Sequence, residues 1–186
     1  MTEIAENTKR LPIAVERFVL HWGDLGSRWG VNRSVSQIHA LLYLAEKPLT
    51  AEDIAETLAM ARSNVSNSLK ELMGWGLIHR VPVMGDRRDR FAADTDIWSI
   101  AAKIAAGRKE RELDPAIRAL EACVAEASAD PKLSRVAAER LNAMLDFTRT
   151  TTGWFEQIKA LPRPTLMALI RLGARVAGFL PKGRAK

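Results

Sequence analysis

Residues 49–83 read LTAEDIAETLAMARSNVSNSLKELMGWGLIHRVPV, and this stretch decides the fold that the sequence predicts. It begins with a short helix, for which Thr50 is the N-cap and Asp53 stands near the third helical position. A three-residue break from Leu58 to Met60 separates this helix from a longer one, which starts at residue 61 or 62. The glycines at 74 and 76 end the longer helix near residue 75. An apolar, β-branched segment then predicts a strand.

The flanking residues complete the pattern. Upstream, residues 12–29 have helical spacing of apolar residues, and Ser34 with Gln37 forms a capping box for a further helix. Downstream, MGDRRD predicts a turn and RFAA a returning strand, so that a small β-hairpin follows the longer helix. Helix, short helix, tight break, helix and hairpin is the order of a winged helix-turn-helix. The expected fold class is mainly α with a small β-hairpin wing.

The rest of the chain predicts helices. A charged run at residues 107–112 interrupts the first apolar stripe after Asp96. Asp114-Pro115 and Asp130-Pro131 each look like an N-cap followed by proline at the first helical position. We therefore expect three parts. Residues 1–33 form an N-terminal helix for packing or dimerisation, residues 34–95 the winged helix-turn-helix, and residues 96–186 a helical dimerisation region.

The longer helix at residues 61–75 has two unlike faces. Val65, Leu69, Leu72 and Met73 recur at helical spacing and are expected to pack inward. The opposite face has no acid and is made of hydrogen-bonding and cationic side chains, as a helix that enters the DNA major groove requires. Asn64, near the start of the helix, is also placed to meet bases or phosphates. The predicted DNA-binding residues of this recognition helix are Arg62, Ser63, Asn64, Ser66, Asn67 and Lys70. The alternative is a plain core helix with a solvated face.

Charge is separated along the predicted winged helix. Residues 36–60 contain one cation and four acids, a net charge of −3, and residues 61–93 contain six cations and three acids, a net charge of +3. The negative segment is expected to face away from DNA. The formal net charge of +6 does not itself locate a site, because seven cations and no acids follow Glu156.

The segment LTAEDIAETLAMARSNVSNSLKELMGWGLIHRVPVMGDRRDRFAAD resembles the MarR group of winged-helix regulators, and its continuation is most similar to the GbsR-like branch. The resemblance covers about residues 22–98. It implies a homodimeric, cytoplasmic transcriptional regulator, expected to be a repressor, that binds an inverted repeat in double-stranded DNA. In the wing, Arg87, Arg88 and Arg90 would contact DNA, and Asp86 and Asp89 would brace these arginines. The sequence departs from the family at Ala61, where a capping Ser or Thr is usual, and at Ala59, where glycine is usual.

Four tryptophans, Trp22, Trp29, Trp75 and Trp98, suggest an effector pocket at the junction of the DNA-binding and dimerisation parts. An aromatic cage can hold a quaternary ammonium group, and the GbsR-like branch is associated with choline-like osmoprotectants. Structural packing of the same rings is the plainer alternative.

Other functions have weaker support. Cys123 is expected to be a buried apolar residue, with a redox sensor as the alternative. The three histidines lack metal-ligand spacing, and we expect no metal, no cofactor and no enzymatic activity. The N-terminus does not resemble a secretory signal, and the most apolar stretch is too short and too charged to span a membrane. The competing function is a protein-interaction module whose basic tail contacts membrane or nucleic acid non-specifically.

Overall fold

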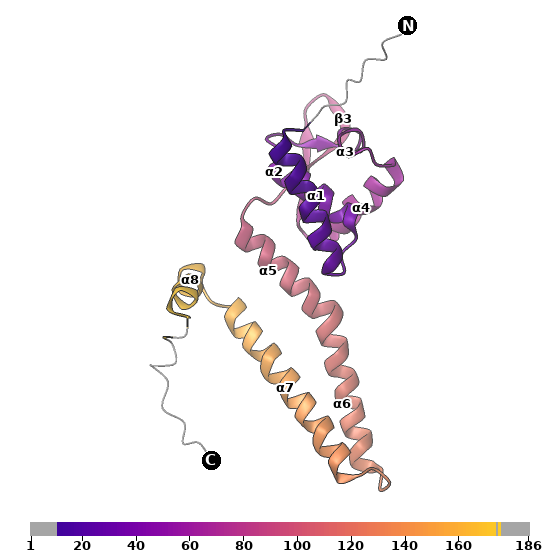
Figure 1. The fold of residues 1–186 in the computed structure, drawn as a ribbon, viewed down its shortest axis with the longest axis vertical. Helices are drawn as coiled ribbons and strands as arrows, with labels where there is room; N and C mark the ends of the chain where they lie inside the picture. Colours follow the sequence, from indigo (N-terminus) through magenta and orange to yellow (C-terminus); the bar gives the residue numbers. More distant parts are fainter. Residues whose placement is uncertain (1–10, 174, 176–186) are drawn as a thin grey trace. The chain divides into compact units, whose positions relative to one another are not determined.

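The computed structural model describes residues 11–173 and residue 175. Its contacts divide the chain into unit 1, residues 1–107, and unit 2, residues 108–186. Unit 1 is a winged helix-turn-helix, as the sequence predicts (Figure 1). Its elements are α1 (Ile13–Arg28), α2 (Arg33–Leu44), β1 (Leu49–Thr50), α3 (Ala51–Leu58), α4 (Arg62–Gly74), β2 (Ile78–Val83), β3 (Asp86–Ala93) and nearly all of α5 (Ile97–Arg108). Helix α1 therefore belongs to the same unit as the winged helix. The dimerisation roles of residues 1–33 and 96–186 stay predictions.

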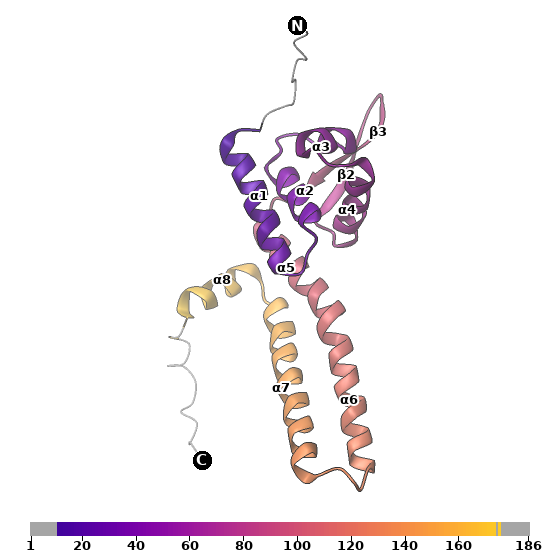
Figure 2. The same ribbon diagram turned by 45° about the vertical axis from the view of Figure 1, so that its right-hand side comes forward.

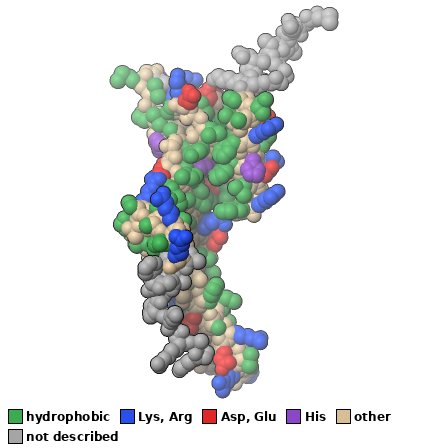
Figure 3. Space-filling view, turned by 60° about the vertical axis from the view of Figure 1, so that its left-hand side comes forward, with side chains coloured by type: hydrophobic (Ala, Val, Ile, Leu, Met, Phe, Trp, Pro, Cys, Tyr) green, Lys and Arg blue, Asp and Glu red, His purple; other side chains and the backbone are tan. Residues whose placement is uncertain are grey.

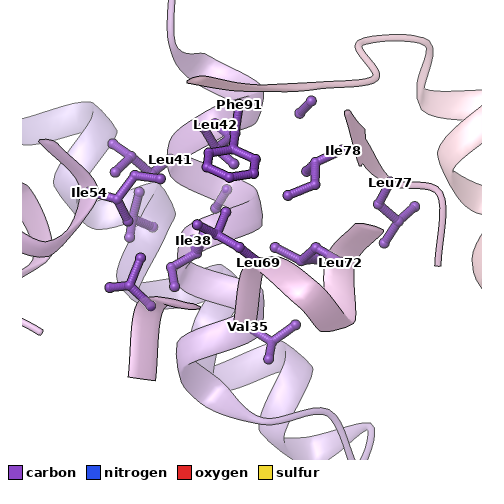
Figure 4. Close-up of a cluster of buried hydrophobic side chains, with 14 of the residues drawn as sticks. Val35, Ile38, Leu41, Leu42, Ile54, Leu69, Leu72, Leu77, Ile78 and Phe91 are labelled. Carbon is purple, nitrogen blue, oxygen red and sulfur yellow. The ribbon is translucent and has the colours of Figure 1, made fainter. Parts of the chain in front are cut away.

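A single apolar cluster holds unit 1 together (Figure 4). Val65, Leu69 and Leu72 of α4 are buried in it, and the half-buried Met73 packs against it, which confirms the predicted inner face. These side chains meet Ile38 of α2 and, from the sheet, other large apolar residues that Figure 4 labels, such as Ile78 and Phe91. Burial of this face fixes the rotation of α4, so its polar face must point outward.

Two glycines let α1 cross α2 closely. A Cβ atom at Gly26 would lie 1.9 Å from the Ser36 hydroxyl, and one at Gly23 would lie 2.6 Å from Cγ of Gln37. Both distances are far inside van der Waals contact, so a side chain at either position would push the helices apart.

The sheet has three antiparallel strands in the order β1-β3-β2. The two-residue strand β1 was not predicted, and it pairs Leu49 with Phe91 and Thr50 with Arg90. The predicted MGDRRD turn is wrong in length, because Val83 pairs with Asp86 and β3 already begins there. Only Met84 and Gly85 form the turn, and Gly85 has a φ of +81°, which glycine adopts without strain.

Side chains cap the starts of α3 and α2 but not the start of α4. The capping box of α3 is confirmed, since the Asp53 amide donates to the Thr50 hydroxyl at 3.1 Å and the Thr50 amide donates to the Asp53 carboxylate at 3.0 Å. The predicted Ser34 cap of α2 is wrong, because Asn32 is the N-cap and accepts from the Ser34 amide at 2.8 Å. Helix α4 begins after Ala61, which has no side chain that could cap it. In the turn before it, Ala59 is left-handed with a φ of 49°, the conformation that glycine favours.

Unit 2 is helical. It contains a π-helix (Lys109–Leu113), α6 (Asp114–Ala129), α7 (Arg135–Lys159) and α8 (Arg163–Leu172). Helices α6 and α7 run side by side in opposite directions (Figures 1 and 2). The π-helix within the charged run at 107–112 leads directly into α6, so the backbone stays helical where the apolar stripe is interrupted.

The two predicted Asp-Pro caps are wrong. The Asp114 carboxylate instead accepts from the Lys109 ammonium at 2.8 Å, and Lys109 also lies 3.4 Å from Glu156 of α7. The hydrogen bond to Asp114 and the contact with Glu156 raise the pKa of Lys109. Asp130 lies in the loop, and Ser134 caps α7 by accepting from the Ala137 amide at 3.2 Å.

Two further expectations concern exposed residues of unit 2 and the apolar stretch near its end. Cys123 is exposed on α6, so its predicted burial is wrong for the single chain. Arg171 and Arg175, near the end of the described chain, are exposed as well. No helix within residues 11–173 is both long and apolar enough to cross a membrane. Residues 176–180 of the apolar stretch lie outside the described part of the chain.

Candidate nucleic-acid interface

Helix α4 presents the polar face that the sequence predicts. Arg62, Ser63, Ser66, Asn67 and Lys70 are all exposed, while the opposite face is buried in the core. Five neighbouring hydrogen-bonding or cationic side chains therefore lie on one surface of a rigidly held helix. Such a surface can offer donors to guanine, a bidentate amide to adenine and cations to phosphate.

Asn64 lies differently from the other predicted contact residues. Its side chain is half-buried, and its amide nitrogen donates to the Ser34 hydroxyl of α2 at 2.9 Å. The amide oxygen accepts from the Ser68 hydroxyl at 3.5 Å. These contacts tie α4 to α2, so the structure gives Asn64 a positioning role.

The wing projects from unit 1 beside α3 and α4 (Figure 2). Arg87 and Arg88 are exposed in β3, one and two residues after the strand begins. Arg90 is half-buried, and its guanidinium donates to the Pro48 carbonyl at 3.4 Å. Arg87 and Arg88 therefore lie near the turn, and Arg90 is turned toward β1.

The structure pairs Asp89 with a different arginine from those expected. Its carboxylate lies 3.5 Å from Arg80 on the neighbouring strand β2. The contact therefore stabilises the hairpin across its two strands and does not brace Arg87, Arg88 or Arg90. Asp86 begins β3, but its side chain lies outside the described structure.

Glu52 is the acid that meets the predicted DNA-binding arginines. It lies in the first turn of α3, where its carboxylate forms an ion pair with Arg62 and lies 4.0 Å from Arg88. Glu52 therefore lies in the same groove as these two arginines, and the expectation that the negative segment faces away from DNA stays a prediction. The sequence gives no sign of this contact, because an acid in the first turn of a helix is already explained by the helix dipole.

A groove of about 380 Å³ separates the recognition helix from the wing. It contains four cations and two acids, so its charge is mixed but net positive. Its charged lining comes from α3, α4 and both strands of the hairpin: Glu52, Arg62, Lys70, Arg80, Arg88 and Asp89.

The structure does not gather the four predicted effector-site tryptophans around one described cavity. Trp22 lines an apolar cavity of about 170 Å³ in unit 1 and stacks on Phe18, with ring centroids 5.5 Å apart. Trp29 is 62 % exposed, and Trp75 and Trp98 are half-buried elsewhere. The remaining lining comes from α2 and α5: His39, Ala40, Tyr43, Ile97 and Ile100.

His39 is the polar residue of this cavity. It is 5 % exposed, and its Nε2 has no hydrogen-bond partner within the described residues. Burial lowers the pKa of His39 from 6.5 to about 4, against a smaller opposing effect of the Asp94 charge. The imidazole is therefore neutral near pH 7.

Asp94 ties α5 to the end of β3. Its carboxylate accepts from the Ser99 hydroxyl at 2.6 Å and from the Lys103 ammonium at 2.9 Å. These hydrogen bonds, with one from the Asp96 amide, hold the pKa of Asp94 well below its usual range. Lys103 also donates to the Gly76 carbonyl at 2.8 Å, so one cation joins α5 to the segment that follows α4.

No cluster of three potential metal ligands occurs among residues 11–173 and 175. The polar groove and the cavity around Trp22 are two candidate binding features of unit 1.

The geometry of unit 1 defines a winged helix-turn-helix protein. In agreement, residues 29–89, about a third of the chain, match the model of the MarR family.

A solved structure has a similar fold. A crystal structure described as a transcriptional regulator has a TM-score of 0.53 and 22 % identity, over 78 % of this chain and 95 % of that one. Two MepR structures from Staphylococcus aureus have TM-scores of 0.37. The regulator of the multidrug efflux pump MepA is 20 % identical, and the MepR-DNA complex is 19 % identical; each match covers 75 % of this chain and 93 % of the other. No curated protein matches the sequence.

Proposed function

We propose that this protein is a sequence-specific, DNA-binding transcriptional regulator. The observation that carries the proposal is the polar, acid-free outer face of α4, exposed beside the wing arginines Arg87 and Arg88. A recognition helix of this composition can read base edges in the major groove, while arginines on a hairpin reach the phosphates or the minor groove. The MarR match over residues 29–89 supports the same function.

The regulator acts as a homodimer in this proposal. Helix α7 buries one face against α6 and exposes a second apolar stripe, in which Val136, Met144, Phe147 and Trp154 share one side of the helix. Helix α1 exposes Ile13 and Leu20, and hydrophobic side chains cover much of the face of unit 1 drawn in Figure 3. Exposed apolar surfaces of this kind mark association sites. Two recognition helices would then enter successive major grooves, roughly 34 Å apart, on an inverted repeat.

An effector controls the dimer in the same proposal. The cavity around Trp22 is lined by three aromatic rings and by the neutral imidazole of His39, which suits a small organic molecule with a cationic or polar group. Occupancy would change the packing of α1, α2 and α5 and so the separation of the two wings. A repressor of the GbsR-like branch, with a choline-like effector, is the specific form we propose. If choline and betaine leave the tryptophan fluorescence unchanged, a choline-like effector is ruled out.

Binding to a labelled promoter fragment in the presence of excess random DNA tests the function. We expect Arg88→Ala to weaken binding to all sequences and to flatten the slope of log K against log salt by about 1. Asn67→Ala should instead reduce the preference for the promoter over random DNA. Equal losses on both DNAs for Asn67→Ala would contradict base reading. A wild-type protein that binds the promoter no better than random DNA would favour the alternative, a protein-interaction module with a basic tail.

A further inference from the structure

We propose that Glu52 is a built-in competitor of DNA, which holds Arg62 and Arg88 until phosphate groups replace its carboxylate. The inference rests on the proposed function, since it describes how the same surface is restrained before binding. It concerns a residue of α3, outside the recognition helix and outside the wing.

The geometry brings one carboxylate to two elements at once. One oxygen of Glu52 pairs with Arg62, the first residue of α4, and the other lies 4.0 Å from Arg88 of β3. All three side chains line the groove between α4 and the hairpin. The carboxylate therefore lies between the two cations, at a place where a DNA phosphate would bind them.

This position distinguishes a competitor from a brace. A brace holds an arginine from behind and remains in contact when the arginine meets DNA, as Asp89 could do for Arg80. Glu52 occupies the space between its two arginines, so an incoming phosphate meets a negative charge there. The Glu52 carboxylate must turn away before both arginines can bind DNA phosphates.

DNA phosphates can replace the Glu52 carboxylate at the two arginines because all three side chains are exposed to solvent. The side chain of Glu52 is 46 % exposed, and those of Arg62 and Arg88 are 69 % and 59 % exposed. Ion pairs at such positions are weak, since water and salt screen them. Glu52 therefore lowers the affinity for DNA without preventing binding, and it reduces the number of cations that attract any polyanion.

Glu56 provides a matched control. It is exposed on the same helix, one turn after Glu52, and no ion pair or hydrogen bond of its side chain occurs among the described residues. Glu52→Gln and Glu56→Gln each remove one negative charge from α3. A difference between the two variants therefore measures the contact with Arg62 and Arg88 and not the change in net charge.

The experiment measures two properties of full-length wild type, Glu52→Gln and Glu56→Gln. One is the salt concentration at which each protein elutes from heparin, and the other is its Kd for a random 20-base-pair duplex at two salt concentrations. We expect Glu52→Gln to elute at higher salt than Glu56→Gln and to bind the duplex about three- to tenfold more tightly at the lower salt. Its salt slope should be steeper by about 1.

Equal behaviour of the two variants, or weaker binding by Glu52→Gln, would overturn the proposal, and weaker binding would identify Glu52 as a brace. If Glu52→Gln unfolds, Glu52→Asp replaces it, because the shorter side chain keeps the charge but withdraws from the arginines. That variant should also exceed wild type in elution salt. A heparin shift without duplex binding by any variant would show that Glu52 competes with polyanions for the two arginines, and it would contradict the proposed DNA-binding function.

Discussion

The side-chain amide of Asn64 donates to the hydroxyl of Ser34 at 2.9 Å, which links the recognition helix α4 to the first turn of α2. The two residues are 30 positions apart in the sequence. Because Asn64 also accepts from Ser68, its amide is part of the internal structure of unit 1. The asparagine that remains exposed on α4 is Asn67.

The two asparagines should therefore respond differently to alanine. We expect Asn64→Ala to lower the free energy of unfolding by about 1 kcal/mol, because it removes a part-buried hydrogen bond between two helices. Asn67→Ala should change stability by less than about 0.5 kcal/mol, since it is an exposed substitution. Urea unfolding followed by circular dichroism measures both. The reverse order of stability loss would contradict the positioning role of Asn64.

The close crossing of α1 and α2 can be tested at Gly26. We expect Gly26→Ala to destabilise the protein by about 1–3 kcal/mol, because the new methyl group would overlap the Ser36 side chain. Gly153 of α7 is the matched control, since a Cβ there would meet nothing within 4 Å. Gly153→Ala should raise stability by about 0.5–1 kcal/mol through helix propensity. A neutral Gly26→Ala would show that the helices are not held at this distance.

The uncapped start of α4 leaves room for stabilisation. Ala61 has the extended backbone of an N-cap, with φ −63° and ψ 139°, but no side-chain oxygen. We expect Ala61→Ser to raise the free energy of unfolding by about 1 kcal/mol, because the hydroxyl can accept from a free amide of the first turn. Ala122→Ser, at an exposed position inside α6, should give no gain. Thermal melts of both variants measure the effect, and equal shifts would argue against the cap.

His39 should make stability depend on pH. The pKa of folded His39, about 4, lies below its usual value of 6.5, so the unfolded chain binds the proton more tightly between these values. Stability is therefore fully present above about pH 6.5 and falls as the pH decreases toward 4. Between pH 7 and pH 5 the loss from this group is about 2 kcal/mol. We expect His39→Gln to unfold with a smaller difference between these two pH values than wild type, and an unchanged difference would contradict the buried, neutral imidazole.

The sequence predicts those features that depend on near neighbours. The capping box of Thr50 and Asp53 involves residues three apart, and the inner face of α4 follows from a simple helical period, so both were predictable. Ala59 was recognisable as a substitute for glycine, and its left-handed backbone agrees.

Features that depend on distant residues, or on an irregular helix, were not predictable in this way. The expected capping box at Ser34 does not form, because Asn32 caps the helix by accepting from the Ser34 amide. The Ser34 hydroxyl accepts instead from the side-chain amide of Asn64, 30 residues further along. Asp114 accepts from Lys109 at the other end of a π-helix and does not cap a new helix. The chain therefore stays helical where Asp114 and Pro115 suggested a new helix start. Glu52 meets Arg62 and Arg88 only because the fold brings three elements to one groove. In each case a side chain with a plausible local role is used by a contact that the chain order does not reveal.

The central claim is that α4 reads DNA sequence in a dimer. Selection of bound duplexes from a randomised library by the full-length wild-type protein, in the presence of competitor DNA, tests it most directly. We predict enrichment of an inverted repeat whose half-sites are separated by about one helical turn, 10–10.5 base pairs from centre to centre. Asn67→Ala should enrich the repeat more weakly. A library that remains random after several rounds, with DNA still retained by wild type, would contradict the claim.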